Sequence, residues 1–534
     1  MTRFSTAVFL FSIGALAASC IEADDKPAVE TDSLTANVCV PTPKIAVVGA
    51  GATGLTTAYV LGKRGYDRVT VFEKDGEVGG FARTRFVNGK PYDLATMFVP
   101  GSTIAGDGIE PLLKEMIQVA GEPLEPAVDF GSLLVTGQGN VYNDRSLPIL
   151  AACNTPAAIA SCKQQLFDSL ALQTKFLGCQ AKGTDPITCG IANPLNLSEN
   201  INEWGARNNV TLFVQLMLYT ADGLGATGDL KRGTPGIALL VPLSYWMPAE
   251  VYRALTQLGV PASEIPDSLP NLKSLYAHNS QRWYFFKNGY QTFWQSLVAN
   301  DGIDVKLNST VKSVKWIWWR PWTKWDVTIA NKQGQLETQQ FDKVIVTTPP
   351  GAAASMLPSD YPQVSLLNSA VAGGYPTNVY LAPVSGLPPV VGSSLPNPFS
   401  FWVKDPSIEP TPTSIPAVRP FFWQRRHAGQ DYMIIGAYNY QDVSLPASFA
   451  ALQDYASNTL GMSVGPYKEV TQVRFPSAPS DFLSWQLGWA ILQGSNGLYF
   501  AGEAFQGSGV PAITNGISTF IPSNFPVQSG WCWP

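Results

Sequence analysis

The pattern of apolar and polar positions is clearest where a short apolar run passes through glycines into a one-sided segment. Residues 45–48 are all apolar, which is typical of a strand buried in a parallel sheet. Leu55, Ala58 and Tyr59 then recur at the spacing of one helix face. A second apolar run at 69–72 predicts another strand. The order strand, helix, strand predicts a βαβ unit.

The alternation of strands and helices is interrupted between residue 101 and about residue 270. In this block we expect a mostly helical insertion, with Thr155 capping one helix and Pro156 in its first turn. The helical or apolar segments predicted here are 109–120, 156–177, 204–219 and 237–246.

The pattern changes again at four consecutive aromatic residues, 283–286, which precede a turn. Beyond them the mixture of strands and helices continues to the end of the chain. The strands predicted in this part lie within 305–316, 344–346, 378–381, 433–437 and 497–503, and the helices at 294–300 and 513–521.

Three glycines separate the first predicted strand from its helix. Gly49, Gly51 and Gly54 have the G-x-G-x-x-G spacing. The first permits a tight turn, the second lets the backbone approach a pyrophosphate, and the third lets the helix pack on the strand. Glu73 follows the second predicted strand, about 20 residues after the glycines. At this position the ribose of a dinucleotide needs a hydrogen-bond acceptor. Together these features predict a dinucleotide-binding domain.

Two later motifs extend this prediction. The pair Gly79–Gly80 forms a second point where backbone can approach phosphate or ribitol, and Arg83 or Arg85 is placed to neutralise charge there. Near the end of the chain a strand ends on Gly502–Glu503, and the segment 507–512 then leads into the helix predicted at 513–521. Because a helix N-terminus carries free N–H groups and a positive dipole end, it suits an electron-rich flavin edge.

The amino-acid composition limits the kinds of ligand that the protein is expected to bind. The chain has 534 residues, enough for two or three domains, with 14% charged residues, 11% aromatic residues and a formal net charge of -5. So small a charge gives no electrostatic case for nucleic acid binding. Without any C-x-x-C spacing, a metal site is not expected. Low charge with many aromatic residues suits a protein that buries a large cofactor and an apolar ligand, although a compact secreted protein without special chemistry would have the same composition.

The N-terminus has the form of a secretion signal. Arg3 precedes an apolar run at 7–18, and small residues suit cleavage before Cys20. We expect residues 1–19 to be a signal peptide and 20–43 a flexible leader, so that the protein is secreted. The run is too short to span a membrane and no later run is long enough, so no transmembrane segment is expected. Lipidation at Cys20 stays open.

Six cysteines remain after Cys20, an even number that suggests disulfides in an exported protein. Closeness in sequence favours the pairs Cys153–Cys162 and Cys179–Cys189, which leaves Cys39–Cys532 to join the termini. Six cysteines allow fifteen pairings, so this connectivity is a hypothesis. Glycosylation sequons, which matter in a host that glycosylates, begin at Asn196, Asn209 and Asn308.

Taken together, VVGAGATGL with Glu73, the pair Gly79–Gly80, and YFAGE before a helix resemble the FAD-dependent amine oxidase-like flavoproteins. The resemblance covers roughly residues 44–525. It implies an α/β, two-domain flavoprotein, with a Rossmann-like FAD-binding domain, an α+β substrate domain inserted in it, and FAD as the cofactor. One departure is Phe81, because many members place arginine directly after the glycine pair.

Under this resemblance the FAD-binding domain comprises 44–100, 276–352 and 481–534, with a helical insertion or substrate domain at 101–275 and the substrate domain at 353–480. Val311 matches the family's backbone contact to adenine. The candidate cofactor-binding residues are Gly49, Gly51, Thr53, Gly54, Glu73, Lys74, Gly79, Gly80, Arg83, Met97, Phe98, Val311, Gly502, Glu503, Val510, Pro511 and Ala512.

A closer similarity is to the polyenoic fatty acid isomerases, flavoproteins that move double bonds in polyunsaturated fatty acids. It rests on MFVP at 97–100, DGLG at 222–225, and the aromatic run that leads into NGYQ at 288–291. It implies a redox-neutral reaction, in which flavin N5 takes a hydride from a doubly allylic carbon and returns it at another carbon. The fatty acid would lie in an apolar tunnel that excludes water.

Trp283, Tyr284 and Phe285 are the candidate substrate-binding residues of that tunnel. The contact to the substrate head group stays open. A bacterial member of the isomerase group uses an arginine for the carboxylate, and the matching stretch at 130–133 has none. We name no catalytic residue, because neither His278 nor His427 is assigned as a general base.

Two other functions stay open. An amine or L-amino-acid oxidase, which makes hydrogen peroxide, would often carry a lysine in the region that matches 371–381, and there is none. Such enzymes also often have an aromatic cage residue where this chain has Val510. The third possibility is a secreted binding protein that keeps FAD without turnover. The sequence does not indicate an oligomeric state.

Overall fold

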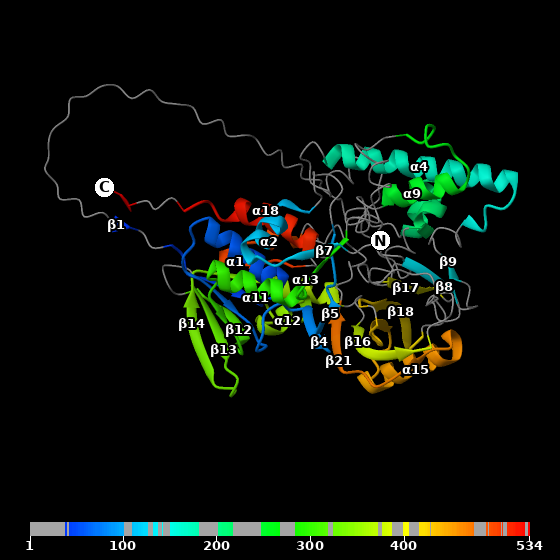
Figure 1. The fold of residues 1–534 in the computed structure, drawn as a ribbon. Helices are drawn as coiled ribbons and strands as arrows, with labels where there is room; N and C mark the ends of the chain where they lie inside the picture. The colour runs from blue at the N-terminus through cyan, green and yellow to red at the C-terminus, as the bar shows by residue number, and fades with distance from the viewer. Residues whose placement is uncertain are drawn as a thin grey trace, which may run out of the picture. The chain divides into compact units, whose positions relative to one another are not determined.

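Figure 1 shows the computed structural model of the chain. The residues that the structure describes are 38–39, 42–100, 109–126, 132–136, 141–142, 150–180, 201–216, 247–266, 283–318, 324–371, 376–386, 399–404, 416–427, 429–474, 488–489, 491–502, 505, 510–528 and 532–533. Predictions that fall outside this part of the chain are those for 1–37, 222–225, 237–246, Cys189, Asn196, His278 and Glu503.

The chain divides into two compact units, residues 1–40 with 530–534, and residues 41–529. In the first unit β1 (Val38–Cys39) pairs antiparallel with β23 (Cys532–Trp533), and Cys39 stands opposite Cys532 in the register. The predicted disulfide between the two cysteines requires such a register. The disulfide itself stays a prediction. The other elements described below belong to the second unit.

The predicted βαβ unit begins a five-stranded parallel sheet. Its order is β11 (Val305–Lys306), β3 (Val69–Phe72), β2 (Ile45–Val48), β15 (Lys343–Val346) and β22 (Leu498–Phe500). Helix α1 (Ala52–Lys63) connects β2 to its parallel neighbour β3. Segments from the start, middle and end of the chain therefore build one sheet, and the predicted α/β class is confirmed.

The two faces of this sheet bury different cores. Ile45 and Val47 belong to a core shared with α1, α2 (Pro111–Ala120), α11 (Tyr290–Asp301) and α18 (Val510–Asn524). Ala46 and Val48 belong to the opposite core. The elements that cover that face are β12 (Thr310–Ile317), β13 (Lys324–Ala330), β14 (Leu336–Phe341), α12 (Pro350–Met356) and α13 (Pro362–Val371). Both faces are covered, which is why the strand is apolar throughout.

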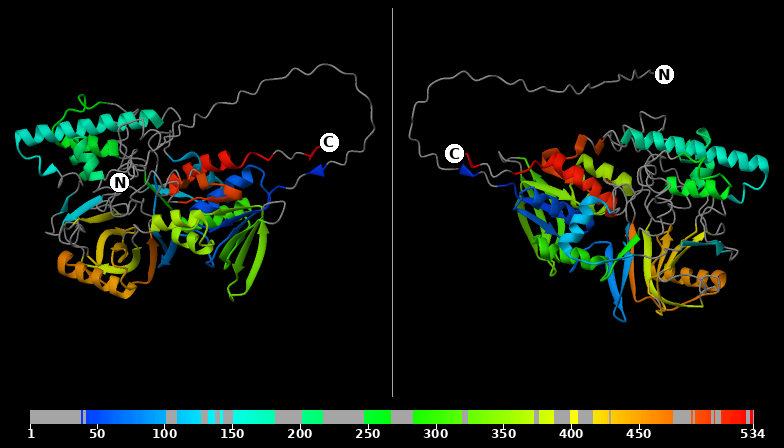
Figure 2. Two further views of the ribbon diagram at one scale, coloured as in Figure 1. Left: turned by 180° about the vertical axis from the view of Figure 1, so that it is seen from behind. Right: turned by 45° about the horizontal axis from the view of Figure 1, so that its top comes forward.

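A second sheet, with eight strands, contains β20 (Ser463–Val464), β16 (Pro376–Ser385), β19 (Tyr432–Asn439), β18 (Val418–Arg425), β17 (Phe399–Lys404), β8 (Ser132–Thr136) and β9 (Val141–Tyr142) in that order, and β21 (Glu469–Arg474) also pairs with β16. Helix α15 (Leu445–Leu460) packs on one face, as Figure 2 shows. The opposite face packs against the hairpin of β4 (Ala82–Val87) and β5 (Lys90–Ala95).

A three-stranded sheet, β6 (Val99–Pro100), β10 (Trp283–Phe286) and β7 (Leu124–Pro126), continues from this hairpin. The short 3-10 helix η3 (Ser495–Gly497) leads into β22.

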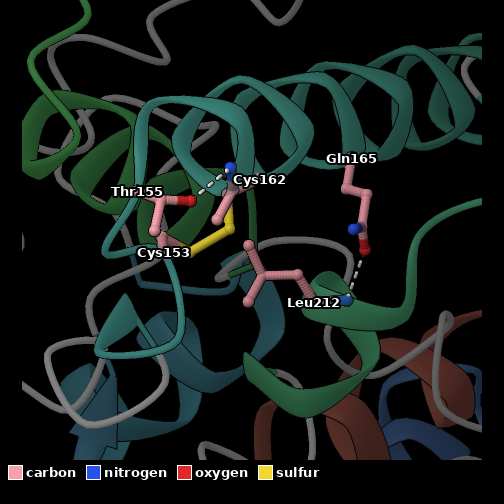
Figure 3. Close-up of a disulfide and its surroundings, with 6 residues drawn as sticks. Cys153, Thr155, Cys162, Gln165 and Leu212 are labelled. Atoms are coloured by element: carbon pink, nitrogen blue, oxygen red, sulfur yellow. Dashed lines mark hydrogen bonds between the residues drawn. A yellow bond between two sulfur atoms is a disulfide. The ribbon is translucent and has the colours of Figure 1, made fainter.

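The helical block has a core of its own, which includes Leu166, Trp204 and Leu255. Its helices are α4 (Pro156–Gln180), α6 (Ile201–Arg207) and α9 (Met247–Gln257). Figure 3 shows the disulfide between Cys153 and Cys162 at the start of α4, which confirms one predicted pairing. Thr155 caps α4 as predicted, because its Oγ1 accepts the N–H of Ala158 at 3.2 Å. Gln165 Oε1 accepts the Leu212 N–H at 2.9 Å (Figure 3), which ties α4 to the segment after α6.

Three element predictions differ from the structure. The insertion contains strands as well as helices, and β8 is part of the eight-stranded sheet. The helix predicted from 204 already runs from Ile201 and ends at Arg207, because Asn209 turns the chain with a left-handed φ of 57°. Helix α11 begins at Tyr290, four residues before its predicted start, directly after the turn at Gly289. Within the described ranges, no helix is long and apolar enough to cross a membrane.

Candidate dinucleotide site and its aromatic wall

The glycine motif at 49–54 and the glycine pair at 79–80 are separate in the chain but contact each other in the structure. Gly51 and Gly79 form a backbone bridge, and the Gly79 N–H donates to Ala50 O at 2.9 Å. Gly80 has a left-handed φ of 59°, and a Cβ there would lie 2.9 Å from Gly51 Cα. A side chain at position 80 would therefore push the motifs apart. The contact leaves a backbone-lined cradle at the start of α1.

The start of α1 offers backbone N–H groups to a ligand. Its N-cap is Gly51, no side chain of the described residues caps the helix, and the first N–H groups of a helix have no intrahelical acceptor. A Cβ on Gly51 would have Gly80 Cα, at 3.7 Å, as its nearest neighbour. A Cβ on Gly54 would instead lie 1.9 Å from Gly49 O, so this glycine lets the helix pack on the turn. Unblocked N–H groups at a helix start form a site for a pyrophosphate.

Glu73, directly after β3, hydrogen-bonds to the glycine turn of the cradle. It is 6% exposed, and its Oε2 accepts the Ala50 N–H at 2.8 Å while its Oε1 accepts the Asp75 N–H at 2.9 Å. The carboxylate therefore lies directly beside the glycine turn, where the predicted ribose contact requires it. In the structure it also fixes the turn itself.

The basic residues predicted near the phosphates are paired with acids. Asp75 binds both Lys74, at 2.8 Å, and Arg83, at 2.7 Å. These cations hold the pKa of Asp75 below its usual value although burial opposes them. Arg85 binds Glu77 at 2.9 Å and Glu469 at 3.4 Å. The charge of Arg83 near the glycine pair is thus shared with Asp75.

Gly502, near the C-terminal end of the chain, lies beside the start of α1. A Cβ on Gly502 would lie 3.8 Å from Thr347 O and 3.9 Å from Thr53 Oγ1, in the first turn of α1. Val510 is 5% exposed at the start of α18, within the core that includes α1. Pro511 and Ala512 lie in the first turn of α18. Gly502 thus joins the cradle.

Val311 lies in β12, in the core on the other face of the parallel sheet. The β12–β13 ladder shifts register between Val311 and Ser313. An interrupted ladder is where a backbone group can turn to a ligand, so the predicted adenine contact stays a prediction with a suitable local geometry.

The strand β10 sends its aromatic residues to opposite sides. Phe286 stacks on Phe293 with ring centroids 4.7 Å apart, in the core of the dinucleotide domain. Tyr284 packs against that same core. Phe285, 4% exposed, instead meets Phe98 edge to face at 5.8 Å. The predicted substrate trio is therefore divided, and only Phe285 is described on the side of Phe98.

Phe98 and Met97 come from the loop that follows β5. Met97 packs against the core between the hairpin and the eight-stranded sheet. The loop begins at Ala95, a non-glycine residue with a left-handed φ of 70°. Such a conformation is uncommon and marks a constrained loop. We call the contact of Phe98 with Phe285 the aromatic wall.

A buried ion pair that no sequence motif predicts supports the aromatic wall. Arg426 Nη1 donates to Asp93 Oδ2 at 2.5 Å, with the two side chains 3% and 1% exposed. Arg426 Nη2 donates to Phe286 O at 2.5 Å, and its guanidinium lies 4.7 Å from the centre of the Phe285 ring. The partners are far apart in the chain and no local motif marks them.

Hydrogen bonds connect this ion pair to the glycine pair. Asp93 Oδ1 accepts from Thr84 Oγ1 at 2.6 Å and from the Tyr290 N–H at 2.7 Å. Thr84 in turn exchanges bonds with Gln291, whose Nε2 donates to Val78 O at 3.0 Å. Val78 directly precedes Gly79. The cradle and the aromatic wall are therefore parts of one bonded frame.

His427 lies beside this frame. Its Nε2 pairs with Pro91 O at 2.7 Å, and its ring meets Tyr92 edge to face at 5.2 Å. Burial lowers the pKa of His427, and the nearby Arg426 acts in the same direction. His427 thus has structural contacts with the hairpin of β4 and β5.

The comparisons with known proteins match this geometry. Residues 52–384, more than half of the chain, match the family model described as flavin containing amine oxidoreductase. A polyenoic fatty acid isomerase from Ptilota filicina is 50% identical over 52 residues, 10% of this chain and 10% of that relative. The curated relatives are matched over about a tenth of their own length.

Among solved structures, a CLA-producing fatty acid isomerase from P. acnes has a TM-score of 0.64 at 14% identity, covering 91% of this chain and 99% of that one. A putrescine oxidase has a TM-score of 0.55 at 14% identity, covering 90% and 98%. At these identities the likeness shows the shared fold.

Proposed function

The chain belongs to the flavin containing amine oxidoreductase family, and from this premise we propose that it is an FAD-dependent isomerase of polyunsaturated fatty acids. Its cofactor is FAD. The Gly51–Gly79 cradle, the open start of α1 and Glu73 are the residues that would hold it. In the proposed reaction a double bond moves to give a conjugated product without net oxidation.

The observation that carries the proposal is the character of the aromatic wall. Phe98 and Phe285 present apolar rings, and the charges beside them, Arg426 and Asp93, are paired with each other. A site that deprotonates or recognises an amine would need a charged or basic group that faces the substrate. An apolar wall over a neutralised ion pair suits a hydrocarbon chain instead.

Bound FAD supplies a two-electron acceptor that can take hydrogen with its electron pair from carbon and give it back. The protein's part is to hold the chain and exclude water. Phe285 contacts both the Arg426 guanidinium, at 4.7 Å, and the Phe98 ring, at 5.8 Å, and these contacts help to position it. The isomerase relatives support this assignment, because one shares local sequence and the other shares the fold.

The test uses linoleic acid deuterated at its doubly allylic carbon. We expect a rise in ultraviolet absorbance from the conjugated product, with deuterium at a new carbon and no matching consumption of oxygen. Some label is lost if reduced flavin exchanges with solvent. Phe285→Ala should slow turnover more than it weakens FAD retention.

The second candidate is an amine or L-amino-acid oxidase, which the fold of putrescine oxidase favours. Stoichiometric hydrogen peroxide from an amine or amino acid, with no conjugated product from any polyene, would assign the protein to that class. A flavin that no substrate alters would instead indicate a binding protein. We also propose that the protein is exported, on the basis of its N-terminal apolar run.

A further inference from the structure

Gln424, in β18, is a buried amide. Its side chain is 0% exposed, and among the described residues neither Oε1 nor Nε2 has a hydrogen-bonding partner. Two other buried amides are bonded: Gln291 through both its atoms, and Asn378 to Ser448 and Gln472. An amide buried without partners costs folding free energy, so its retention calls for a reason.

The register of the eight-stranded sheet places Gln424 on the face that packs against the β4–β5 hairpin. Gln424 stands opposite Ile434, and Ile434 stands opposite Leu381. Both of these apolar residues belong to the core shared with the hairpin. Trp423, the preceding residue, belongs to the core under α15 on the other face. Paired residues of neighbouring strands share a face, so Gln424 faces the hairpin side.

The backbone register continues from Gln424 to the outer strands, because Gln424 stands opposite Ser400 of β17 and Ser400 stands opposite Ser132 of β8. On the other side of Gln424 the hairpin covers Ile434 and Leu381.

Gln424 also lies two residues before Arg426, whose guanidinium contacts Asp93 of the hairpin and the Phe285 ring. The guanidinium that supports the aromatic wall therefore lies two residues from the amide along the chain, directly after the end of β18. A ligand that lies along the wall would have the amide as a hydrogen-bonding group.

We propose that Gln424 binds the carboxyl group of the fatty acid. This inference rests on the proposed function and names the group that recognises the acid end of the substrate. A primary amide offers one acceptor and donor hydrogens, so it can pair with the C=O and O–H of a protonated carboxyl group, or donate to a carboxylate. A bound acid would supply the hydrogen bonds that the amide lacks within the described residues.

The test uses stearic acid and methyl stearate, which lack a doubly allylic carbon and bind without reacting. We expect FAD-loaded protein to bind the acid about tenfold more tightly than the ester, the size typical of a lost hydrogen-bonding pair. Gln424→Met keeps the length of the side chain without its polar atoms. This variant should bind acid and ester alike, measured by tryptophan fluorescence titration.

A second readout separates ligand binding from a structural role. Because Gln424→Met removes an unpaired buried amide, its melting temperature should equal or exceed that of the wild type. The control is Gln453→Met in α15, where Nε2 donates to Val464 O at 2.7 Å. That variant should melt at a lower temperature and keep the preference for the acid.

The inference fails if Gln424→Met keeps the preference for the acid, melts at a lower temperature than the wild type, or does not fold. If wild-type protein binds neither stearic acid nor its ester, the proposed function fails as well. The two failures are therefore distinguishable.

Discussion

At the scale of single residues, the glycines of the cradle differ in how much space there is for an added side chain. Gly54 and Gly80 are held by close backbone contacts, whereas Gly51 has an ordinary φ of -80° and open space beyond 3.7 Å. A Cβ at Gly51 would thus point toward the ligand site at ordinary contact distance from Gly80, without a close approach to the backbone. This distinction makes Gly51 the best probe of the cofactor site.

We predict that Gly51→Val keeps the fold and loses FAD. The valine side chain would occupy the space where the backbone must approach the pyrophosphate. Flavin absorbance per protein should fall to background, while the far-ultraviolet circular dichroism stays that of the wild type. The matched control is Gly62→Val on the same helix, where a Cβ meets nothing within 4 Å. A Gly51→Val protein with full flavin content would contradict the assignment.

His427 leads to a prediction about pH. Burial lowers its folded-state pKa below the usual histidine value of about 6.5, so below that pH the unfolded chain binds a proton more readily than the folded protein does. Stability should therefore fall as pH decreases below about 6.5. His427→Gln should show a shallower loss over this range in urea unfolding. Equal slopes for both proteins would exclude this contribution.

At the scale of elements, the ion pair of Asp93 and Arg426 joins parts that the sequence separates. It connects β5 to the end of β18, and through Phe286 O it also reaches β10. Asp93 also accepts the first N–H of α11. Burial raises the pKa of Asp93, while Arg426 and the hydrogen bond from Thr84 oppose that shift. Four elements thus depend on one carboxylate.

We predict that Asp93→Ala destabilises the protein by roughly 3–5 kcal/mol, because it leaves the Arg426 charge buried without its partner. The free energy of unfolding in urea measures this loss. The double variant Asp93→Leu with Arg426→Met should be less destabilised than the single variant, since no charge is left buried. If the double variant loses as much as the sum of the single ones, the two residues do not act as a pair.

At the scale of the whole molecule, one site collects segments from the entire chain. The cradle uses 49–54 and 79–80, and Gly502 reaches it from the last part of the chain. A ligand that binds folded protein alone stabilises it by mass action. Loading with FAD should accordingly raise the resistance of the whole chain to unfolding.

The cysteines give the prediction that belongs to this scale. Export with removal of the first nineteen or so residues would expose the mature chain to an oxidising compartment, where disulfides persist. One of the three predicted pairs, Cys153–Cys162, is present. Thiol titration of denatured, unreduced mature protein should find almost no free thiol, and N-terminal sequencing should begin near Cys20. Several free thiols would contradict the predicted connectivity.

Local patterns were sufficient for the first βαβ unit, the glycine turn and Glu73, because each depends on neighbours within one or two elements. Strand burial, helix spacing and turn geometry are all visible in a short window of sequence. The Thr155 cap and the Cys153–Cys162 bond were predictable for the same reason. Strand alternation also contained a signal that went unused, since it separates Phe285 from Tyr284 and Phe286.

Only the tertiary structure revealed which distant residues meet. Asp93 and Arg426 are 333 residues apart, and nothing near either of them indicates the other. In the sequence, Gln424 is an ordinary polar residue of a strand. The sheet register shows that it lies on a buried face. Local periodicity tells which side of a strand is covered, but the partner that covers it is chosen by the packing of whole elements. The cradle could therefore be predicted from the sequence, whereas the frame behind the aromatic wall and the unpaired amide could not.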